Sequence, residues 1–166
     1  MAYQPENLMA DYGEKLLRYA TSILYNHHDA EDVVQDVFIT ACQNKAAFDG
    51  ENLSAWLYKI TYNKSINKLR RRKFLIFGDI PENTVAPENT GFSDEVLYAL
   101  GLIKPQDRAL LYARIVEGYS YEELSQQMGQ SAAVLRKRYE RARKKVAEHL
   151  NFDSAEKGAL RYEQQY

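Results

Sequence analysis

The chain has 166 residues, an apolar share of 45%, and 22 Lys and Arg residues against 23 Asp and Glu. This length fits one domain or two small ones, and no apolar run approaches the roughly 20 residues that a membrane-spanning helix needs. The single cysteine, Cys42, excludes an internal disulfide and favours a reducing compartment. The N-terminal residues lack the basic start and apolar core of a signal peptide. We therefore expect a cytoplasmic protein that does not insert into a membrane.

The first two predicted helices differ in the face that they leave outside. The first covers 9–25, where apolar residues recur at helical spacing. Asp29 is a good N-cap for the second, in which Val33, Val37 and Ala41 share an apolar face. Cys42 continues that apolar run, so we expect a buried structural thiol. Another face of this helix is acidic and polar, with Asp29, Asp32, Gln35 and Asp36. Such a face does not suit DNA, so it meets either solvent or a basic protein partner.

A third helix is predicted from Ser54, as its cap, to about Lys73, after the turn-rich stretch 48–52. Its part 59–73 holds seven basic residues and no acidic one. Aromatic and amide side chains lie among them, and these suit unpaired bases, which stack on rings and offer their edges. For Trp56 alone a place in the core is an equally good interpretation. For the helix as a whole, the nucleic-acid interpretation is the better one.

The stretch 74–92 is predicted to be a flexible linker. It contains two prolines and two glycines, which cannot continue a helix, and its charged residues are all acidic. We therefore expect an all-α chain of two compact helical domains, over 1–73 and 93–150, followed by a polar C-terminal tail over 151–166.

Four helices are predicted within 93–150, and their boundaries carry recognisable signals. The starts are marked by Ser93 or Asp94, by Pro105, by the capping box Ser120–Glu123 and, after the break at Gly129, by Ser131. The last helix is expected to end at about Leu150. Because a short glycine turn joins the last two helices, they match the helix-turn-helix arrangement.

The last predicted helix combines an apolar stripe with a basic outer face. Leu135, Tyr139, Ala142 and Val146 form the stripe. Packing it inward turns Arg136, Lys137, Glu140, Arg141 and Lys144 outward, with Arg143 flanking them. A helix with several basic residues in its exposed N-terminal half fits the DNA major groove. The alternative is a solvated surface helix, but the capping box, the turn and the stripe coincide with the charge, which favours DNA binding.

Several motifs resemble one known family. HDAEDVVQDVFITA, FDGENLSAWLYKITYN from Phe48, and KLRRRK resemble the conserved second region of extracytoplasmic-function (ECF) RNA polymerase sigma factors. LIKPQDRAL, EGYSYEELS and RYERARKK resemble the fourth region of the same family. The similarity covers about Leu8 to Leu150 in the family's order, with a linker between. Helix-turn-helix segments are common, so the resemblance rests on both sets of motifs occurring together in this order.

The resemblance implies a bacterial RNA polymerase subunit that directs promoter recognition and opening, with no chemistry and no cofactor of its own. It implies that core polymerase is contacted, at the clamp helices of its largest subunit, by Asp29, Asp32, Gln35 and Asp36. The melted −10 element would be engaged by Phe48, Asp49, Gly50, Glu51, Asn52, Lys59, Tyr62, Asn63 and Asn67. The duplex −35 element would be read by Arg136, Lys137, Glu140, Arg141 and Arg143. Most members of the family are held inactive by an anti-sigma factor, which is therefore a candidate partner.

Two rival interpretations explain less of the sequence. His27-His28-Asp29 resembles the metal-dependent HD phosphohydrolases, but those need a further upstream histidine, and no histidine precedes His27. We therefore expect no metal site there. A stand-alone helix-turn-helix regulator that binds duplex DNA would account for 120–145. It would leave the basic helix over 56–73 and the acidic face without a role.

Overall fold

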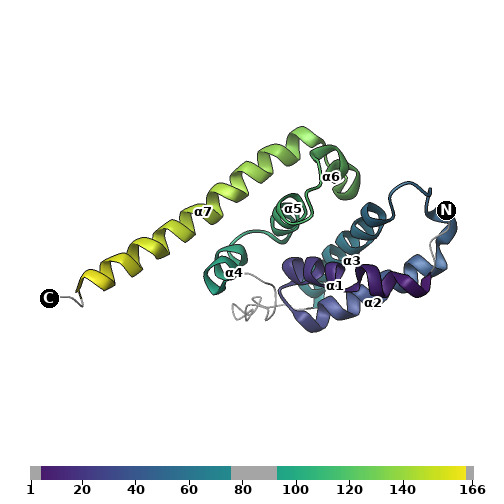
Figure 1. The fold of residues 1–166 in the computed structure, drawn as a ribbon, viewed down its shortest axis with the longest axis horizontal. Helices are drawn as coiled ribbons and strands as arrows, with labels where there is room; N and C mark the ends of the chain where they lie inside the picture. Colours follow the sequence, from purple (N-terminus) through teal and green to yellow (C-terminus); the bar gives the residue numbers. More distant parts are fainter. Residues whose placement is uncertain (1–4, 76–92, 164–166) are drawn as a thin grey trace.

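The chain folds into helices only, in the computed structural model of the protein (Figure 1). The structure describes residues 5–75 and 93–163, with side chains over 7–73 and 93–150. Within these ranges there is no strand, which confirms the predicted all-α fold, and no helix combines the length and apolarity that crossing a bilayer requires. In chain order the elements are α1 (Pro5–Leu24), α2 (His27–Gln43), the short 3₁₀ helix η1 (Lys45–Ala47), α3 (Leu53–Leu75), α4 (Asp94–Gly101), α5 (Pro105–Ile115), α6 (Tyr121–Met128) and α7 (Ala132–Glu163).

Helices α1, α2 and α3 form the first unit around a shared core. Leu16 and Ile23 of α1, Val37 of α2 and Leu57 of α3 are completely buried there. Each large apolar side chain removed from water stabilises the fold by about 1.5–3 kcal/mol. The apolar periodicity of the sequence therefore identified the faces on which these helices meet.

The caps of α2 and α3 differ from the expected ones. The Asn26 side chain accepts a hydrogen bond from the Asp29 amide at 2.9 Å, so α2 begins earlier and Asp29 is not its N-cap. Likewise, the Asn52 side chain accepts from the Ala55 amide at 2.9 Å, in place of the expected Ser54. Asn caps a helix as well as Asp or Ser does. In both helices the asparagine that comes earlier in the chain is the N-cap. The Asp29 carboxylate and the Ser54 hydroxyl can therefore make contacts outside their own helix.

The expectation of a buried Cys42 is wrong, because its side chain is exposed. Its neighbour Ala41 is completely buried and Phe38 is nearly so. One residue along a helix turns the side chain by about 100°, so Cys42 leaves the buried face that Ala41 ends.

Helices α4 to α7 form the second unit, and their predicted start signals are confirmed. Ser93 caps α4, Pro105 is the first residue of α5, and the Ser131 side chain accepts from the Val134 amide at 3.3 Å. In the capping box of α6, the Glu123 amide donates to Ser120 at 3.2 Å and the Ser120 amide donates to the Glu123 carboxylate at 2.8 Å. Gly129 ends α6 in the left-handed conformation, with φ at 67°, which glycine adopts without strain.

Helix α7 is longer than expected and continues to Glu163, away from the other helices (Figure 1). The residues after Leu150 include no proline and several good helix formers, such as Ala155, Lys157 and Leu160, so nothing stops the helix at that point. Helix α3 includes the first two residues of the predicted linker, and the rest of the linker lies outside the described residues.

The two units pack against each other, α1 against α5 and α3 against α6. Four tyrosines contribute to this contact. Tyr19 of α1 lies 4.9 Å from Tyr58 of α3 and 5.7 Å from Tyr112 of α5, measured between ring centroids. Tyr119, which precedes α6, lies 5.4 Å from Tyr58, and its hydroxyl is hydrogen-bonded to the Ser54 hydroxyl at 2.8 Å. One apolar cluster therefore runs through both units.

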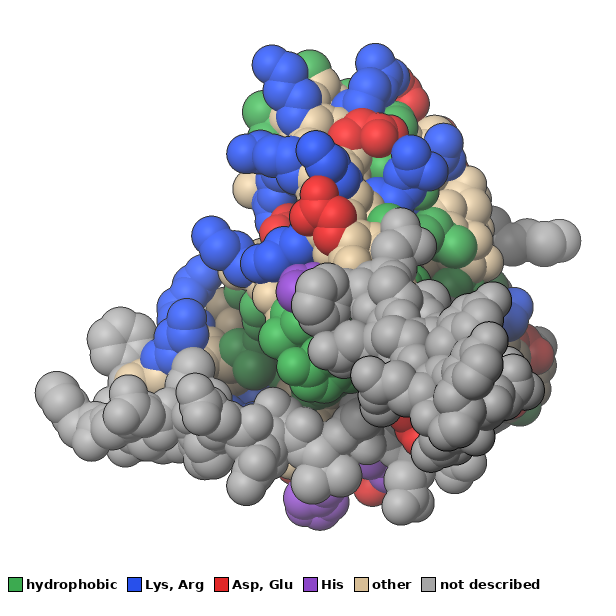
Figure 2. Space-filling model, turned by 90° about the vertical axis from the view of Figure 1, so that its left-hand side faces the viewer, with side chains coloured by type: hydrophobic (Ala, Val, Ile, Leu, Met, Phe, Trp, Pro, Cys, Tyr) green, Lys and Arg blue, Asp and Glu red, His purple; other side chains and the backbone are tan. Residues whose placement is uncertain are grey.

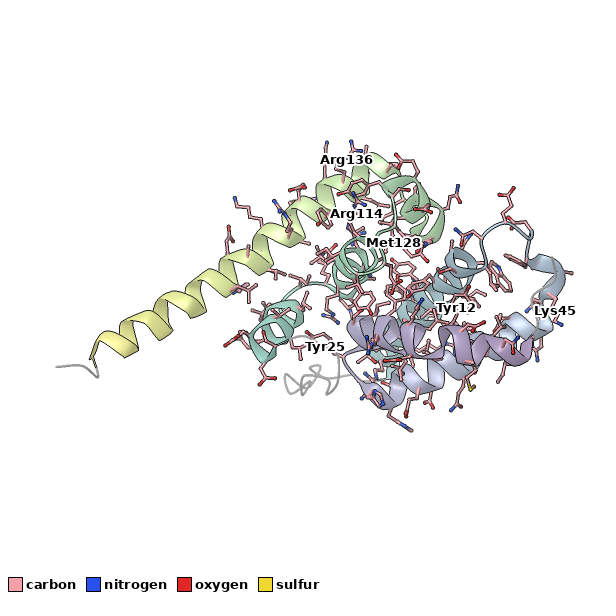
Figure 3. All side chains as sticks on the ribbon, viewed as in Figure 1. Tyr12, Tyr25, Lys45, Arg114, Met128 and Arg136 are labelled. Atoms are coloured by element: carbon pink, nitrogen blue, oxygen red, sulfur yellow. The ribbon has the colours of Figure 1, made fainter. Side chains whose placement is uncertain are left out.

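Arg108 of α5 links the units most directly, although it is only 7% exposed. Its guanidinium donates to the backbone carbonyls of Ser22 at 2.9 Å and Ile23 at 2.7 Å, both in the last turn of α1. Carbonyls in the last turn of a helix have no donor within the helix, and a cation is favourable there. Arg108 also lies 4.5 Å over the ring of Tyr25, which is labelled in Figure 3. The Tyr25 hydroxyl donates to the carbonyl of Leu97 on α4.

Candidate nucleic-acid and polymerase interfaces

The basic half of α7 is held in place by its apolar stripe. Leu135 is completely buried, Ala142 is 5% exposed, and Tyr139 and Val146 are half-buried against the second unit. The five residues predicted to read duplex DNA are all exposed, namely Arg136, Lys137, Glu140, Arg141 and Arg143. Figure 2 shows Lys and Arg side chains concentrated over the upper part of one face, at the height of this half of α7.

The arginines of this helix have different surroundings. Arg138 turns inward, where its guanidinium lies 2.6 Å from the Asp107 carboxylate of α5 and donates to the Gln130 side chain at 2.7 Å. Arg143 lies 3.8 Å from Glu140, and both are well exposed, so this surface pair stabilises little. Arg138 therefore fixes α7 on α5, while Arg136, Arg141 and Arg143 stay accessible to a partner.

The predicted −10 residues of α3 are divided between two faces. Lys59, Asn63 and Asn67, spaced four residues apart, are exposed along one side of the helix. Tyr62 is only 8% exposed. Tyr62 belongs to the apolar cluster that runs through both units. Burial raises its pKa, which the charge of Arg138 lowers and that of Asp107 raises. The packed arrangement of the units therefore covers Tyr62 and leaves the other three accessible.

The loop 48–52 is ordered by contacts of its first and last residues. Phe48 is half-buried, with its ring centroid 5.4 Å from that of Trp56, and Asn52 caps α3. Asp49 accepts a hydrogen bond from the Glu51 amide at 3.0 Å. Gly50 has φ at 89°, which other residues rarely adopt. Asp49, Gly50 and Glu51 form the exposed tip.

The predicted acidic face of α2 is partly covered by basic residues of α3. Asp29 is 9% exposed and forms an ion pair with Arg72. Lys68 lies 3.4 Å from Asp29 and 3.3 Å from Asp32. The remaining members, Gln35 and Asp36, are exposed, as is Asp32. The free acidic surface is therefore smaller than the sequence suggested, and Lys68 and Arg72 are tied to α2.

The two histidines before Asp29 lie on the surface beside one carboxylate. His27 is 3.3 Å and His28 is 3.9 Å from Glu31. Among the described side chains, no group of three or more His, Cys, Asp or Glu is placed to hold a metal ion.

Sequence reasoning missed the residues that join the units, namely Tyr25, Arg108, Tyr112 and Tyr119. For Arg108 a signal was present. It lies in phase with Leu111, Tyr112 and Ile115, so helical spacing put a charge on an otherwise apolar face. Such an arginine is expected to find buried partners. Burial lowers the pKa of Arg108 to about 10, with the nearby Tyr25 acting in the opposite direction, so the guanidinium remains charged at neutral pH.

Two family descriptions match the two units separately. Sigma-70 region 2 matches residues 8–74, which include α2 and almost all of α1 and α3. Sigma-70 region 4 matches residues 93–146, which run from the cap of α4 into α7.

Individual relatives and one solved structure agree with these matches. The chain is 32% identical to the ECF RNA polymerase sigma factor EcfG of Rhodopseudomonas palustris, over 85% of this chain and 82% of that protein. It is 26% identical to the ECF RNA polymerase sigma factor SigE of Mycolicibacterium smegmatis, over 91% of this chain and 63% of the longer relative. The fold is similar to that of the sigma factor RpoE of Bartonella quintana, solved in complex with the anti-sigma factor NepR, with a TM-score of 0.73 and 25% identity. That similarity covers 89% of this chain and 97% of RpoE.

The order of the two regions, the exposed basic half of α7 and the similarity over most of both lengths agree with one another. The chain belongs to the ECF RNA polymerase sigma factors, the DNA-binding factors that direct transcription initiation at promoters.

Proposed function

We propose that this sigma factor divides its task among three surfaces: α7 reads the −35 element, α3 with the loop 48–52 acts on the −10 element, and the face of α2 docks on core polymerase. The observation that carries the proposal is the separation of charge on exposed residues. Basic side chains dominate the start of α7, whereas Asp32, Gln35 and Asp36 form an acidic and polar face on α2. We expect no catalytic chemistry from the chain itself, and we place its action in the cytoplasm, where the polymerase and the promoters are.

For the −35 element, the support is the combination of exposure and rigid placement. Arg136, Lys137 and Arg141 project from a helix whose opposite face is buried and whose start is fixed by the turn at Gly129. A helix held in this way can enter the major groove with its N-terminal half leading. Glu140 can accept a hydrogen bond from a cytosine amino group.

For the −10 element, the exposed row of Lys59, Asn63 and Asn67 fits single-stranded DNA, since amides bind base edges and lysine binds phosphate. Tyr62 joins this surface only if it becomes exposed, because it is buried in the packed arrangement, near the charges of Asp107 and Arg138 of the second unit. The proposal therefore includes a separation of the two units before Tyr62 contacts DNA.

For polymerase, the accessible docking residues are Asp32, Gln35 and Asp36. Asp29 contributes to a basic partner only if that partner replaces Arg72 and Lys68. We further propose an anti-sigma factor as a partner. The support is the likeness to RpoE in its complex with NepR, because an anti-sigma factor that stabilises the packed arrangement would keep Tyr62 covered.

The proposal for α7 is tested by binding of the polymerase holoenzyme to promoter duplexes with single substitutions in the −35 element, at two salt concentrations. We expect Arg136→Ala to lose about 1–3 kcal/mol of binding free energy for the preferred base at one position of the −35 element. The variant should therefore discriminate less between bases at that position. We expect Arg141→Ala to weaken binding to all duplexes by the same factor and to make the affinity less dependent on salt, as the loss of a phosphate contact does. The control is Arg18→Ala, an exposed arginine of α1. If both α7 variants behave like the control, this face is only a solvated surface.

A further inference from the structure

Tyr121, the first residue of α6, contacts side chains from both neighbouring helices. Arg136 of α7 lies over its ring at 5.1 Å from the centroid, and Arg114 of α5 lies over it at 4.9 Å. The ring of Tyr139, one turn after Arg136, meets it edge to face at 6.0 Å. Figure 3 labels Arg136 near the start of α7 and Arg114 on the neighbouring helix α5. An aromatic ring is therefore placed directly beside one of the arginines proposed to read DNA.

The ring of Tyr121 is held more firmly than the arginine that rests on it. The capping box of Ser120 and Glu123 fixes the backbone at the start of α6. Arg114 donates to the carbonyl of Tyr119 at 2.9 Å, so its guanidinium is anchored on the α5 side. Tyr121 itself is half-buried, whereas Arg136 is exposed. The contact therefore restrains Arg136 more than it restrains the ring.

Stacking restrains an arginine without using up its hydrogen-bond donors. A guanidinium is planar, and a ring contacts its face, while all of its N–H groups point outward in the plane. Recognition of guanine uses two of those donors, to O6 and N7. An exposed arginine without such a contact samples many rotamers, and ordering them opposes binding.

We propose that Tyr121 is a positioning residue for −35 recognition. The ring restrains the Arg136 guanidinium that lies over it, so that the donors on the guanidinium edge are oriented for a base before DNA arrives. This inference rests on the proposed function, because it requires that Arg136 contacts the −35 element. Tyr121 acts through Arg136 and needs no DNA contact of its own.

The test is a double-mutant cycle in the holoenzyme, with Tyr121→Leu, Arg136→Ala and the double variant. Tyr121→Phe keeps the aromatic face and serves as the matched control. The probes are the duplexes that the wild-type holoenzyme enriches from a pool randomised in the −35 region, together with unselected duplexes of the same length. The readouts are the dissociation constant and the base preference after a new selection.

Because an exposed cation on an aromatic ring contributes modestly, we expect Tyr121→Leu to bind the enriched duplexes about two- to fivefold more weakly. Binding to unselected duplexes should not change, and Tyr121→Phe should match the wild type. In the Arg136→Ala background, Tyr121→Leu should have no further effect. Tyr121→Met, which fills the site with an unbranched chain, replaces Tyr121→Leu if the latter lowers the melting temperature.

The outcomes separate the two levels of the proposal. If Arg136→Ala changes neither affinity nor base preference, the proposed contact of Arg136 with the −35 element is wrong. If Arg136→Ala weakens binding, but Tyr121→Leu lowers the affinity by the same factor with and without Arg136, only the positioning role of Tyr121 is overturned. Failure of Tyr121→Phe to retain wild-type binding would also overturn it, since the hydroxyl and not the ring face would then matter.

Discussion

Replacement of Arg108 by methionine should loosen the contact between the two helical units. Methionine has a similar length and fills the buried space, but it donates no hydrogen bonds. In the wild type, Arg108 donates to the carbonyls of Ser22 and Ile23, and to that of Ile103 at 2.8 Å. The first two carbonyls belong to the other unit, so the substitution acts directly on the packing between the units.

The expected magnitude follows from these carbonyls. A buried acceptor that loses its donor costs about 1–3 kcal/mol, so two of them would cost roughly 2–6 kcal/mol if they stayed dry. Burying the guanidinium has its own cost, which lowers its pKa, and the variant is relieved of this cost. We therefore expect a net loss near 2–3 kcal/mol, which increases the separated population by roughly 30- to 150-fold. Water can reach the carbonyls when the units separate, so separation rather than unfolding should result.

Distance measurements between two labels can detect this separation. Cys42 is the only cysteine and is exposed, so it accepts one label, and a Lys145→Cys substitution on α7 provides the second. Double electron–electron resonance should give one narrow distribution for the parent protein and a broader, longer one for Arg108→Met. Arg141→Met, an exposed arginine exchanged for the same residue, is the control. Equal distributions for both variants would refute the capping role of Arg108.

Three further predictions concern docking, helix ends and pH. Replacement of Asp32 and Asp36 by lysine should weaken association with core polymerase and leave binding to duplex DNA unchanged. The control pair Asp11→Lys and Glu14→Lys, at exposed residues of α1, should change neither property. Equal loss of polymerase binding in the two double variants would contradict the docking role. Thermal denaturation should show that Gly129→Ala destabilises the protein by about 1 kcal/mol, because φ is 67° at this residue. Gly13→Ala inside α1 should stabilise it by about 0.5–1 kcal/mol, because the added Cβ would lie at an ordinary distance of 3.6 Å from Met9. Changes of the same sign in the two variants would contradict the role of the left-handed conformation at Gly129. Burial raises the pKa of Tyr25 and Tyr112 to about 12, so the stability that their protonated forms provide is complete below pH 10 and lost as the pH rises towards about 12. The free energy of unfolding of the wild type should therefore fall across that window more than that of Tyr25→Phe, and equal pH dependence of the two proteins would contradict the role of Tyr25.

Local sequence patterns predicted the helix boundaries of the second unit well, because few other residues nearby could have started or ended those helices. Pro105, the Ser120–Glu123 capping box and Gly129 act through the backbone within a few residues, so sequence alone is enough to place them. The caps of α2 and α3 were misplaced because two good capping residues lie close together in each case, and local preference does not choose between Asn26 and Asp29.

The contacts between the units could not be predicted in the same way. The sequence did not distinguish Tyr62 from an exposed residue of the same helix. It is buried near the charges of Asp107 and Arg138, which are distant in sequence. The pairing of Arg72 with Asp29 likewise joins residues 43 positions apart. Periodicity predicts which face of a helix is buried, but it does not identify the helix that covers that face.

The division of labour between α3 and α7 is tested most directly by footprinting one promoter with three holoenzymes. Permanganate reactivity measures strand opening at the −10 element, and protection of the duplex measures −35 binding. We predict that Asn63→Ala lowers permanganate reactivity and keeps the −35 protection. Arg136→Ala with Arg141→Ala should lose the −35 protection and still initiate transcription normally from a template whose −10 element is already melted. If Asn63→Ala gives normal reactivity, or if both variants lose both signals equally, the two units do not act on separate promoter elements.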